Sequence, residues 1–215
     1  MVTIGQSPRT DVTSDIKDIL GPDIEIIECG ALDGLTLDDI KELEPEKREY
    51  ILVTRMHDGT QVKVSRKKII QKIQSCIEKI EDYVDIVMIL CTGDLPRLNS
   101  KKLLIKPSVF LYNIVVSLLP KGKLGILIPS PDQVKEAENK WRKSGLELVI
   151  KTFPPYVEEN VEKIANEFRK EKVDMIVLDC IGYGRKISEV IKKITKRPVF
   201  LPRTLLARIL RELIE

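Results

Sequence analysis

Residues 85–93, DIVMILCTG, align without a gap on residues 174–182, DMIVLDCIG, so that Cys91 and Cys180 occupy equivalent positions. Each stretch is a short apolar run that reaches a cysteine and, two positions later, a glycine. Continuous apolar runs of this length are typical of parallel strands, because helices cover both faces of a parallel sheet. The pair therefore predicts an internal repeat with one cysteine at the carboxyl end of each buried strand.

Similar apolar runs elsewhere alternate with segments of helical periodicity. Further strands are expected at 2–4, 24–27, 123–128 and 146–150. Helices are expected at 66–82, 131–144, 157–171, 184–195 and 203–214. Alternation of this kind is typical of βαβ units and a mainly parallel sheet.

A second matching pair, Ser7-Pro8 and Ser130-Pro131, follows an apolar strand in each half and begins a loop before a helix. Ser7 lies 84 residues before Cys91, whereas Ser130 lies 50 residues before Cys180, so the first half carries an insertion. Residues 50–65 alternate apolar and polar side chains around an Asp58-Gly59 turn, which predicts a β-hairpin. We expect the insertion to be this hairpin, at about 48–65.

The repeat predicts an α/β fold of two pseudo-symmetric lobes, each with a mainly parallel sheet flanked by helices, and a hairpin inserted in the first lobe. We expect residues 1–105 with 200–215 to form the first lobe and residues 106–199 the second. Ligands of open α/β sheets bind outside the carboxyl ends of the strands. The two cysteines and the two serines are all expected at such ends.

Composition excludes several classes of function. A formal net charge of +3 and 5% aromatic residues offer little to a nucleic acid, which is recognised through basic surfaces and stacking platforms. No apolar run reaches the length of a membrane span, and the start MVTIGQSPRTDV does not resemble a signal peptide. We expect a cytoplasmic protein without a nucleic-acid or membrane partner.

The four cysteines form no CxxC pair, and the only histidine, His57, lies in the expected hairpin turn. Neither a metal site nor a disulfide framework is expected from these spacings. Cys76 falls within an apolar helical stripe and Cys29 follows a strand without a counterpart in the second half. Both are expected to be core thiols.

Cys91 and Cys180 are candidates for acid/base chemistry. Backbone N–H groups of the loop after a strand can lower the pKa of a thiol there. One thiolate could then remove a proton α to a carboxylate while the opposite thiol supplies a proton to the other face. No cofactor is needed if hydrogen-bond donors stabilise the developing charge.

These motifs resemble those of the aspartate/glutamate/hydantoin racemase superfamily. Within it, VTIGQSPRTD at 2–11, VSRKKI at 64–69 and VLDCIGYG at 177–184 resemble the AroM family over nearly the whole chain. The resemblance implies two lobes, cofactor-independent racemisation or isomerisation, and a small carboxylate bound between Cys91 and Cys180. Racemases usually follow these cysteines with Asn-Thr and with Thr-His or Ala-Gly, whereas this chain has Thr-Gly-Asp and Ile-Gly.

Other candidates for ligand binding flank the cysteines and the serines. They are Gln6, Ser7, Arg9, Thr92, Gly93, Asp94, Ser130, Gly182 and Tyr183. Arg9 could bind a ligand carboxylate through two hydrogen bonds, or it could belong with Asp11 to the cap of the first helix. Gly93 and Gly182 could equally be turn glycines. Asp179 is a minor candidate, since a carboxylate beside Cys180 could tune or repel its thiolate.

Three functions remain open. The first is a racemase or isomerase that uses both thiols, and the second is a decarboxylase or cis–trans isomerase that uses one. The third is a protein that binds a small carboxylate or an aromatic-pathway metabolite without turnover. The apolar stripe of the C-terminal helix is expected to pack on a lobe, with a homodimer interface as the alternative.

Overall fold

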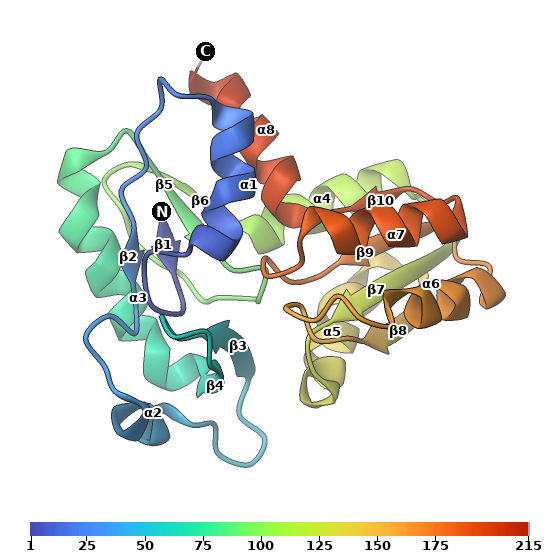
Figure 1. Ribbon diagram of the computed structural model, residues 1–215, viewed down its shortest axis with the longest axis horizontal. Coiled ribbons are helices and arrows are strands. Elements are labelled where there is room, and N and C mark those ends of the chain that lie inside the picture. Colours follow the sequence, from blue (N-terminus) through green and yellow to red (C-terminus); the bar gives the residue numbers. More distant parts are fainter. Residues whose placement is uncertain (215) are drawn as a thin grey trace.

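The computed structural model describes residues 1–214 and contains two parallel sheets of four strands each, together with a two-stranded hairpin (Figure 1). The first sheet has the order β2-β1-β5-β6, made of Cys29–Gly30, Val2–Thr3, Ile86–Leu90 and Leu103–Ile105. The second has the order β10-β9-β7-β8, made of Val199–Phe200, Met175–Leu178, Lys123–Ile128 and Glu147–Thr152. Read backwards, the second order places β7 where β1 stands and β9 where β5 stands. The predicted pseudo-symmetric α/β lobes are therefore confirmed.

Helices connect and cover these strands. The α-helices are α1 (Thr10–Leu20), α2 (Leu37–Leu43), α3 (Arg66–Ile80), α4 (Pro107–Leu118), α5 (Val134–Trp141), α6 (Val161–Lys170), α7 (Arg185–Thr195) and α8 (Pro202–Ile214). Short 3-10 turns are η1 (Glu81–Tyr83), η2 (Pro131–Gln133) and η3 (Arg142–Ser144). The segment expected as one helix at 131–144 is thus η2, α5 and η3 in succession. None of the helices within residues 1–214 is both long and apolar enough to cross a bilayer.

The four-stranded sheet of the first lobe packs between helices, whose apolar stripes cover its two faces. On one face, Ile69, Ile73 and Ile77 of α3 are fully buried in one cluster with Val2 and Ile89 of the strands. On the other face, α1 and α8 lie side by side and pack on Met88 and Leu90 (Figure 1). Full burial of such a side chain contributes about 1.5–3 kcal/mol. The C-terminal stripe therefore packs on the first lobe.

The second lobe repeats the arrangement. Trp141 of α5 and Val115 of α4 are buried with β7 on one face, and Phe168 of α6 and Ile191 of α7 are buried on the other. At the carboxyl ends of its strands, Ile128 of β7 and Asp179 after β9 line the cavity described below.

The hairpin is confirmed as β3 (Ile51–Arg55) paired antiparallel with β4 (Gln61–Ser65). It has no counterpart in the second lobe, yet it contacts that lobe. Gln133 Nε2 donates to the Ile51 carbonyl at 3.0 Å, and Lys63 forms an ion pair with Asp132. The hairpin therefore bridges the two lobes at the start of α5.

One expected strand is wrong. Residues 24–27 form no strand, and β2 forms only at Cys29–Gly30. Ile24 and Ile26 instead pack against the cluster beneath α1 and α8. These two side chains are apolar because they pack against this cluster, and not because they belong to a strand.

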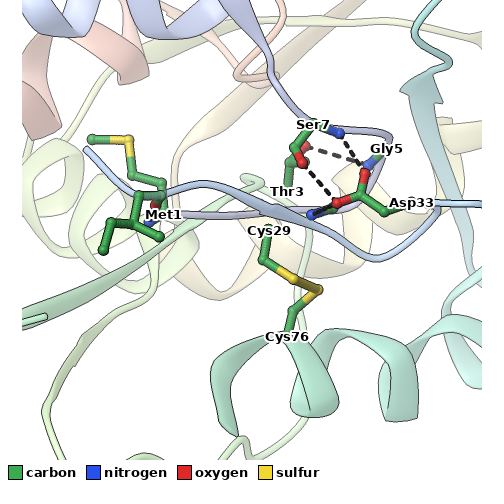
Figure 2. The surroundings of a disulfide bond; sticks show 9 residues. Met1, Thr3, Gly5, Ser7, Cys29, Asp33 and Cys76 are labelled. Carbon is green, nitrogen blue, oxygen red and sulfur yellow. Dashed lines mark hydrogen bonds between the residues drawn. A yellow bond between two sulfur atoms is a disulfide. The ribbon is translucent and has the colours of Figure 1, made fainter. Parts of the chain in front are cut away.

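Cys29 and Cys76 form a disulfide, which corrects the expectation of two core thiols (Figure 2). The bond joins β2 to α3, with Cα atoms 5.6 Å apart. Beside it, the Asp33 carboxylate accepts hydrogen bonds from the Gly30 and Ser7 N–H groups and from the Ser7 hydroxyl. The spacing of 47 residues gave no sign of the bond, because a buried half-cystine and a buried thiol occupy the same apolar patterns.

Candidate functional site

A cavity lies between the carboxyl ends of β5 and β9, where the two lobes meet. Its empty space, including the open mouth, amounts to about 630 Å³. Apolar and polar side chains from both lobes and from the hairpin line it. The polar and ionisable residues are Arg9, Tyr50, Thr54, Cys91, Thr92, Gln133, Glu136, Lys140, Tyr156, Asp179 and Cys180.

The two cysteines have equivalent surroundings within this cavity. Each follows a buried strand, and each sulfur accepts a hydrogen bond from the N–H two residues later, Gly93 for Cys91 and Gly182 for Cys180, at 3.3 Å in both cases. A Cβ at Gly93 would lie 2.7 Å from the Leu52 side chain, so Leu52 would have to move to admit a larger residue. The duplicated motif thus places two matched thiols in one cavity.

Burial controls the titration of both thiols. It raises the pKa of Cys91 to about 12 and that of Cys180 to about 11. The N–H donors oppose this shift, as do Lys140 near Cys91 and Arg9 near Cys180, while Asp179 reinforces it. The expected lowering of the thiol pKa by loop dipoles is therefore wrong in its net effect. Each thiolate also disfavours the other, so a single thiolate forms first.

Alkylation by iodoacetamide is expected to be slow at pH 7–8 and to speed up about tenfold per pH unit, because only the thiolate reacts. The rate should still be rising at pH 10, with Cys180 ahead of Cys91. Mass spectrometry of peptides after timed labelling measures both rates, and N-acetylcysteine gives the reference curve. A plateau below pH 9 for either thiol would contradict the effect of burial.

Lys140 of α5 connects the two halves of the cavity. Its ammonium group donates to both oxygens of Asp179, at 2.7 and 2.9 Å, and to the Thr92 carbonyl at 2.9 Å. Asp179 also accepts from Trp141 Nε1 at 2.7 Å. All three ammonium donors are used, so this buried ion pair has the additional hydrogen bonds that compensate for its desolvation. Lys140 therefore links Thr92, which follows Cys91, to Asp179, which precedes Cys180.

Arg9 is buried at the cavity wall and is already paired. Its Nε and Nη2 atoms donate to the two oxygens of Asp11 at 2.9 and 2.8 Å, and Nη2 also donates to the Tyr156 hydroxyl. Burial opposes its charge, but the Asp11 carboxylate and the Tyr156 hydroxyl outweigh burial and raise its pKa. The bidentate geometry expected for a ligand carboxylate is thus occupied by Asp11. Arg9 contributes to the cavity as a fixed positive charge.

Arg203 of α8 positions the loop after Cys180. It is 3% exposed and donates to the carbonyls of Ile181 and Gly182 at 3.0 and 2.7 Å. Further bonds reach the Asp11 carbonyl and the Asp15 carboxylate of α1. The C-terminal helix therefore anchors a loop of the second lobe to the first.

The structure brings together part of the set expected from sequence. Cys91, Cys180, Arg9, Thr92 and Gly93 line the cavity. The candidates that do not line it are Gln6, Ser7, Asp94, Ser130, Gly182 and Tyr183.

Each residue outside the cavity has another role. Gln6 bonds to the carbonyls of Leu32 and Leu35, and Ser7 bonds to Asp33. Asp94 is exposed, with its N–H donating to the Tyr50 hydroxyl. These residues shape the loops around the first sheet.

In the second lobe, the Ser130 hydroxyl donates to Asp132 at the start of η2. Tyr183 is fully buried and donates to the Phe153 carbonyl. The Gly182 N–H donates to the Cys180 sulfur, but Gly182 itself does not line the cavity. These residues lie in the loops that follow β7 and β9, as predicted, but they do not line the cavity.

Several cavity residues were not expected. Tyr50 enters from the start of the hairpin, Tyr156 from the loop after β8, and Gln133, Glu136 and Lys140 from one side of η2 and α5. Spacings of three and four residues placed the last three on one helical face, which was the available signal. Nothing in the spacing of Tyr50 or Tyr156 indicated that either residue would reach the cavity.

Comparison with solved structures shows the same fold in enzymes of low sequence identity. Glutamate racemase from Aquifex pyrophilus superposes with a TM-score of 0.58 and 17% identity, over 100% of this chain and 84% of that one. The maleate isomerase Iso from Pseudomonas putida S16 gives 0.64 and 11%, over 99% and 91%. Unliganded arylmalonate decarboxylase gives 0.57 and 13%, over 97% and 90%.

No curated protein matches the sequence. The family model described as AroM protein, in contrast, matches residues 1–214, which is nearly the full length. This range includes both lobes, the inserted hairpin and the two cysteine motifs. The chain therefore belongs to the AroM family.

Proposed function

We propose that the protein is a cofactor-independent racemase or isomerase of a small carboxylate, with Cys91 and Cys180 as its acid and base. The observation that carries the proposal is the matched pair of thiols in one cavity, each with the same N–H contact. The fold shared with a racemase and an isomerase supports the general kind of chemistry. The substrate side chain is not specified by these features.

The proposed step moves one proton at each face of a carbon. One cysteine, as the thiolate, takes the proton α to the carboxylate, and the electron pair passes into the carboxyl group. The other cysteine, as the thiol, gives its proton to the opposite face of the same carbon. Lys140 and Arg9, each paired with a carboxylate, are the two cationic side chains of the cavity wall where negative charge develops. The thiol and thiolate have then exchanged roles, and atoms and charge balance.

The raised pKa of both thiols favours the donation of a proton by one cysteine and disfavours the removal of a proton by the other. A thiol with a pKa near 11 or 12 is a ready proton donor at neutral pH but forms its thiolate rarely. Formation of the single thiolate that catalysis needs therefore requires either stabilisation by the bound ligand or a higher pH. A rate that rises from pH 7 to pH 10 follows from this requirement.

Solvent deuterium incorporation tests the proposal without a guess about the product. NMR would follow the α-proton of aspartate, glutamate, malate-like acids, hydantoins and shikimate-pathway compounds in D₂O with the enzyme. Exchange at one carbon, faster at pH 9 than at pH 7, is the expected result. If none of these compounds exchanges its α-proton, the result would count against catalysis.

The second candidate is a protein that binds a small carboxylate without turnover. The pKa values of the two thiols favour it, because both thiols are protonated at neutral pH and neither can then act as the base. A ligand that raises the melting temperature while its α-proton stays unexchanged over long incubation would support binding alone.

A further inference from the structure

One wall of the cavity carries two hydrogen-bond acceptors that lack a partner. Gln133 Oε1 and Glu136 Oε2 are both buried, and neither accepts a hydrogen bond within residues 1–214. Both residues line the cavity between the two thiols. They lie three positions apart, at the end of η2 and in the first turn of α5, and so on the same side of this segment. Buried oxygens of this kind are costly unless something donates to them.

The Gln133 side chain is held in one orientation. Its Nε2 atom donates to the Ile51 carbonyl at 3.0 Å, and a carbonyl accepts only from the NH₂ end of an amide. The remaining oxygen is therefore an acceptor by necessity. Since Ile51 belongs to the hairpin of the first lobe, a contact between the lobes fixes this acceptor in the cavity wall.

The charges of the residues that line the cavity indicate which kind of hydrogen-bond donor would fit these two oxygens. The two cations of the lining are already matched, Arg9 by Asp11 and Lys140 by Asp179. Glu136 forms no ion pair in the described part of the chain. The cavity thus has one carboxylate without a cation, beside an amide oxygen without a donor.

We propose that Gln133 and Glu136 form a subsite for a protonated amine of the ligand. This inference rests on the proposed function and narrows its substrate class to small carboxylates that also carry an ammonium group. An ammonium group brings three donors and a positive charge, so it satisfies both oxygens and pairs with the carboxylate. A hydroxyl brings one donor and no charge, and therefore satisfies only one of the two.

The test uses acids that differ only at the carbon bearing the donor. Suitable sets are succinate, malate and aspartate, then glutarate, 2-hydroxyglutarate and glutamate, then 3-phenylpropionate, phenyllactate and phenylalanine, with both enantiomers of the chiral acids. Isothermal titration calorimetry measures each affinity for the wild type, for Glu136→Gln and for Glu138→Gln. Glu138 lies on the same helix but does not line the cavity, so it is the matched control for loss of charge.

In at least one set, the amine is expected to bind about tenfold or more tightly than the acid without a donor, with the hydroxy acid between them. Glu136→Gln should remove about tenfold of the amine's affinity and leave the acid without a donor within about twofold. Glu138→Gln should change neither. The wild-type ranking alone is decisive if Glu136→Gln does not fold.

Equal affinities within every set would overturn the subsite while leaving the racemase proposal intact. Equal losses for all members of a set in Glu136→Gln would also overturn it. Preferred binding of the amine without α-proton exchange would sustain the subsite and count against the catalytic proposal. If none of the acids binds, both proposals fall.

Discussion

Replacing Cys180 by serine is expected to abolish inversion of the substrate's α-carbon, and Cys91→Ser is expected to do the same. A serine hydroxyl has the shape of a thiol and is slightly smaller, but it is far too weak an acid to replace the thiol, and general acid/base groups contribute about 10²–10⁴-fold to rate. Chiral chromatography of the product, started from each enantiomer in turn, measures the loss. Asp94→Asn, in the exposed loop after Gly93, is the control that should keep full activity.

The two variants also separate the mechanisms. With a thiol on each face, any exchange that remains in Cys180→Ser must be confined to one enantiomer, and in Cys91→Ser to the other. Loss of activity in only one variant would favour a single essential thiol, as in the one-thiol alternative. Full inversion in either variant would refute the two-thiol proposal.

Reduction of the Cys29–Cys76 disulfide is expected to lower the free energy of unfolding by about 4 kcal/mol. The bond closes a loop over a separation of 47 residues, and the chain-entropy relation for a loop of this length gives that magnitude. Urea denaturation of the oxidised and the reduced wild type measures the difference without any substitution. The slope with urea should stay the same or rise slightly on reduction, because the reduced unfolded chain is less compact and exposes more surface.

A Cys29→Ser, Cys76→Ser protein provides the control, since reductant should leave its midpoint unchanged. Cys91 and Cys180 are free, so an effect of reductant on that variant would point to a different disulfide. Identical midpoints for oxidised and reduced wild type would show that the bond does not contribute to stability.

The fold could be predicted because the sequence repeats itself where burial is complete. Strands such as β5 and β9 are covered on both faces, so they appear as continuous apolar runs whose likeness survives in the two halves. Ile24 and Ile26 are also apolar, but they are partly buried against the cluster beneath α1 and α8, and an apolar side chain alone does not distinguish the two cases. The disulfide was missed for the same reason, since its cysteines satisfy the core pattern whether bonded or free.

The site could be predicted only where one strand end determines it. Cys91 and Cys180 follow their strands directly, and local sequence places them in the cavity. Tyr50 and Lys140 reach the same cavity because the hairpin and α5 approach each other across the lobes. That approach is made by contacts between distant parts of the chain, such as Gln133 with Ile51 and Lys63 with Asp132. No spacing within a short segment carries this information.

The hairpin makes the cavity walls unequal although the strands around it are related by pseudo-symmetry. Leu52, Val53 and Thr54 line the cavity from the first lobe, and the second lobe has no inserted hairpin to match them. Mirror-image ligands would therefore meet different surfaces and differ in KM and in kcat. Their equilibrium in solution is nevertheless one to one, so an enzyme that interconverts them must have equal kcat/KM in the two directions. Any gain in affinity for one enantiomer at the hairpin is then matched by slower turnover of that same enantiomer.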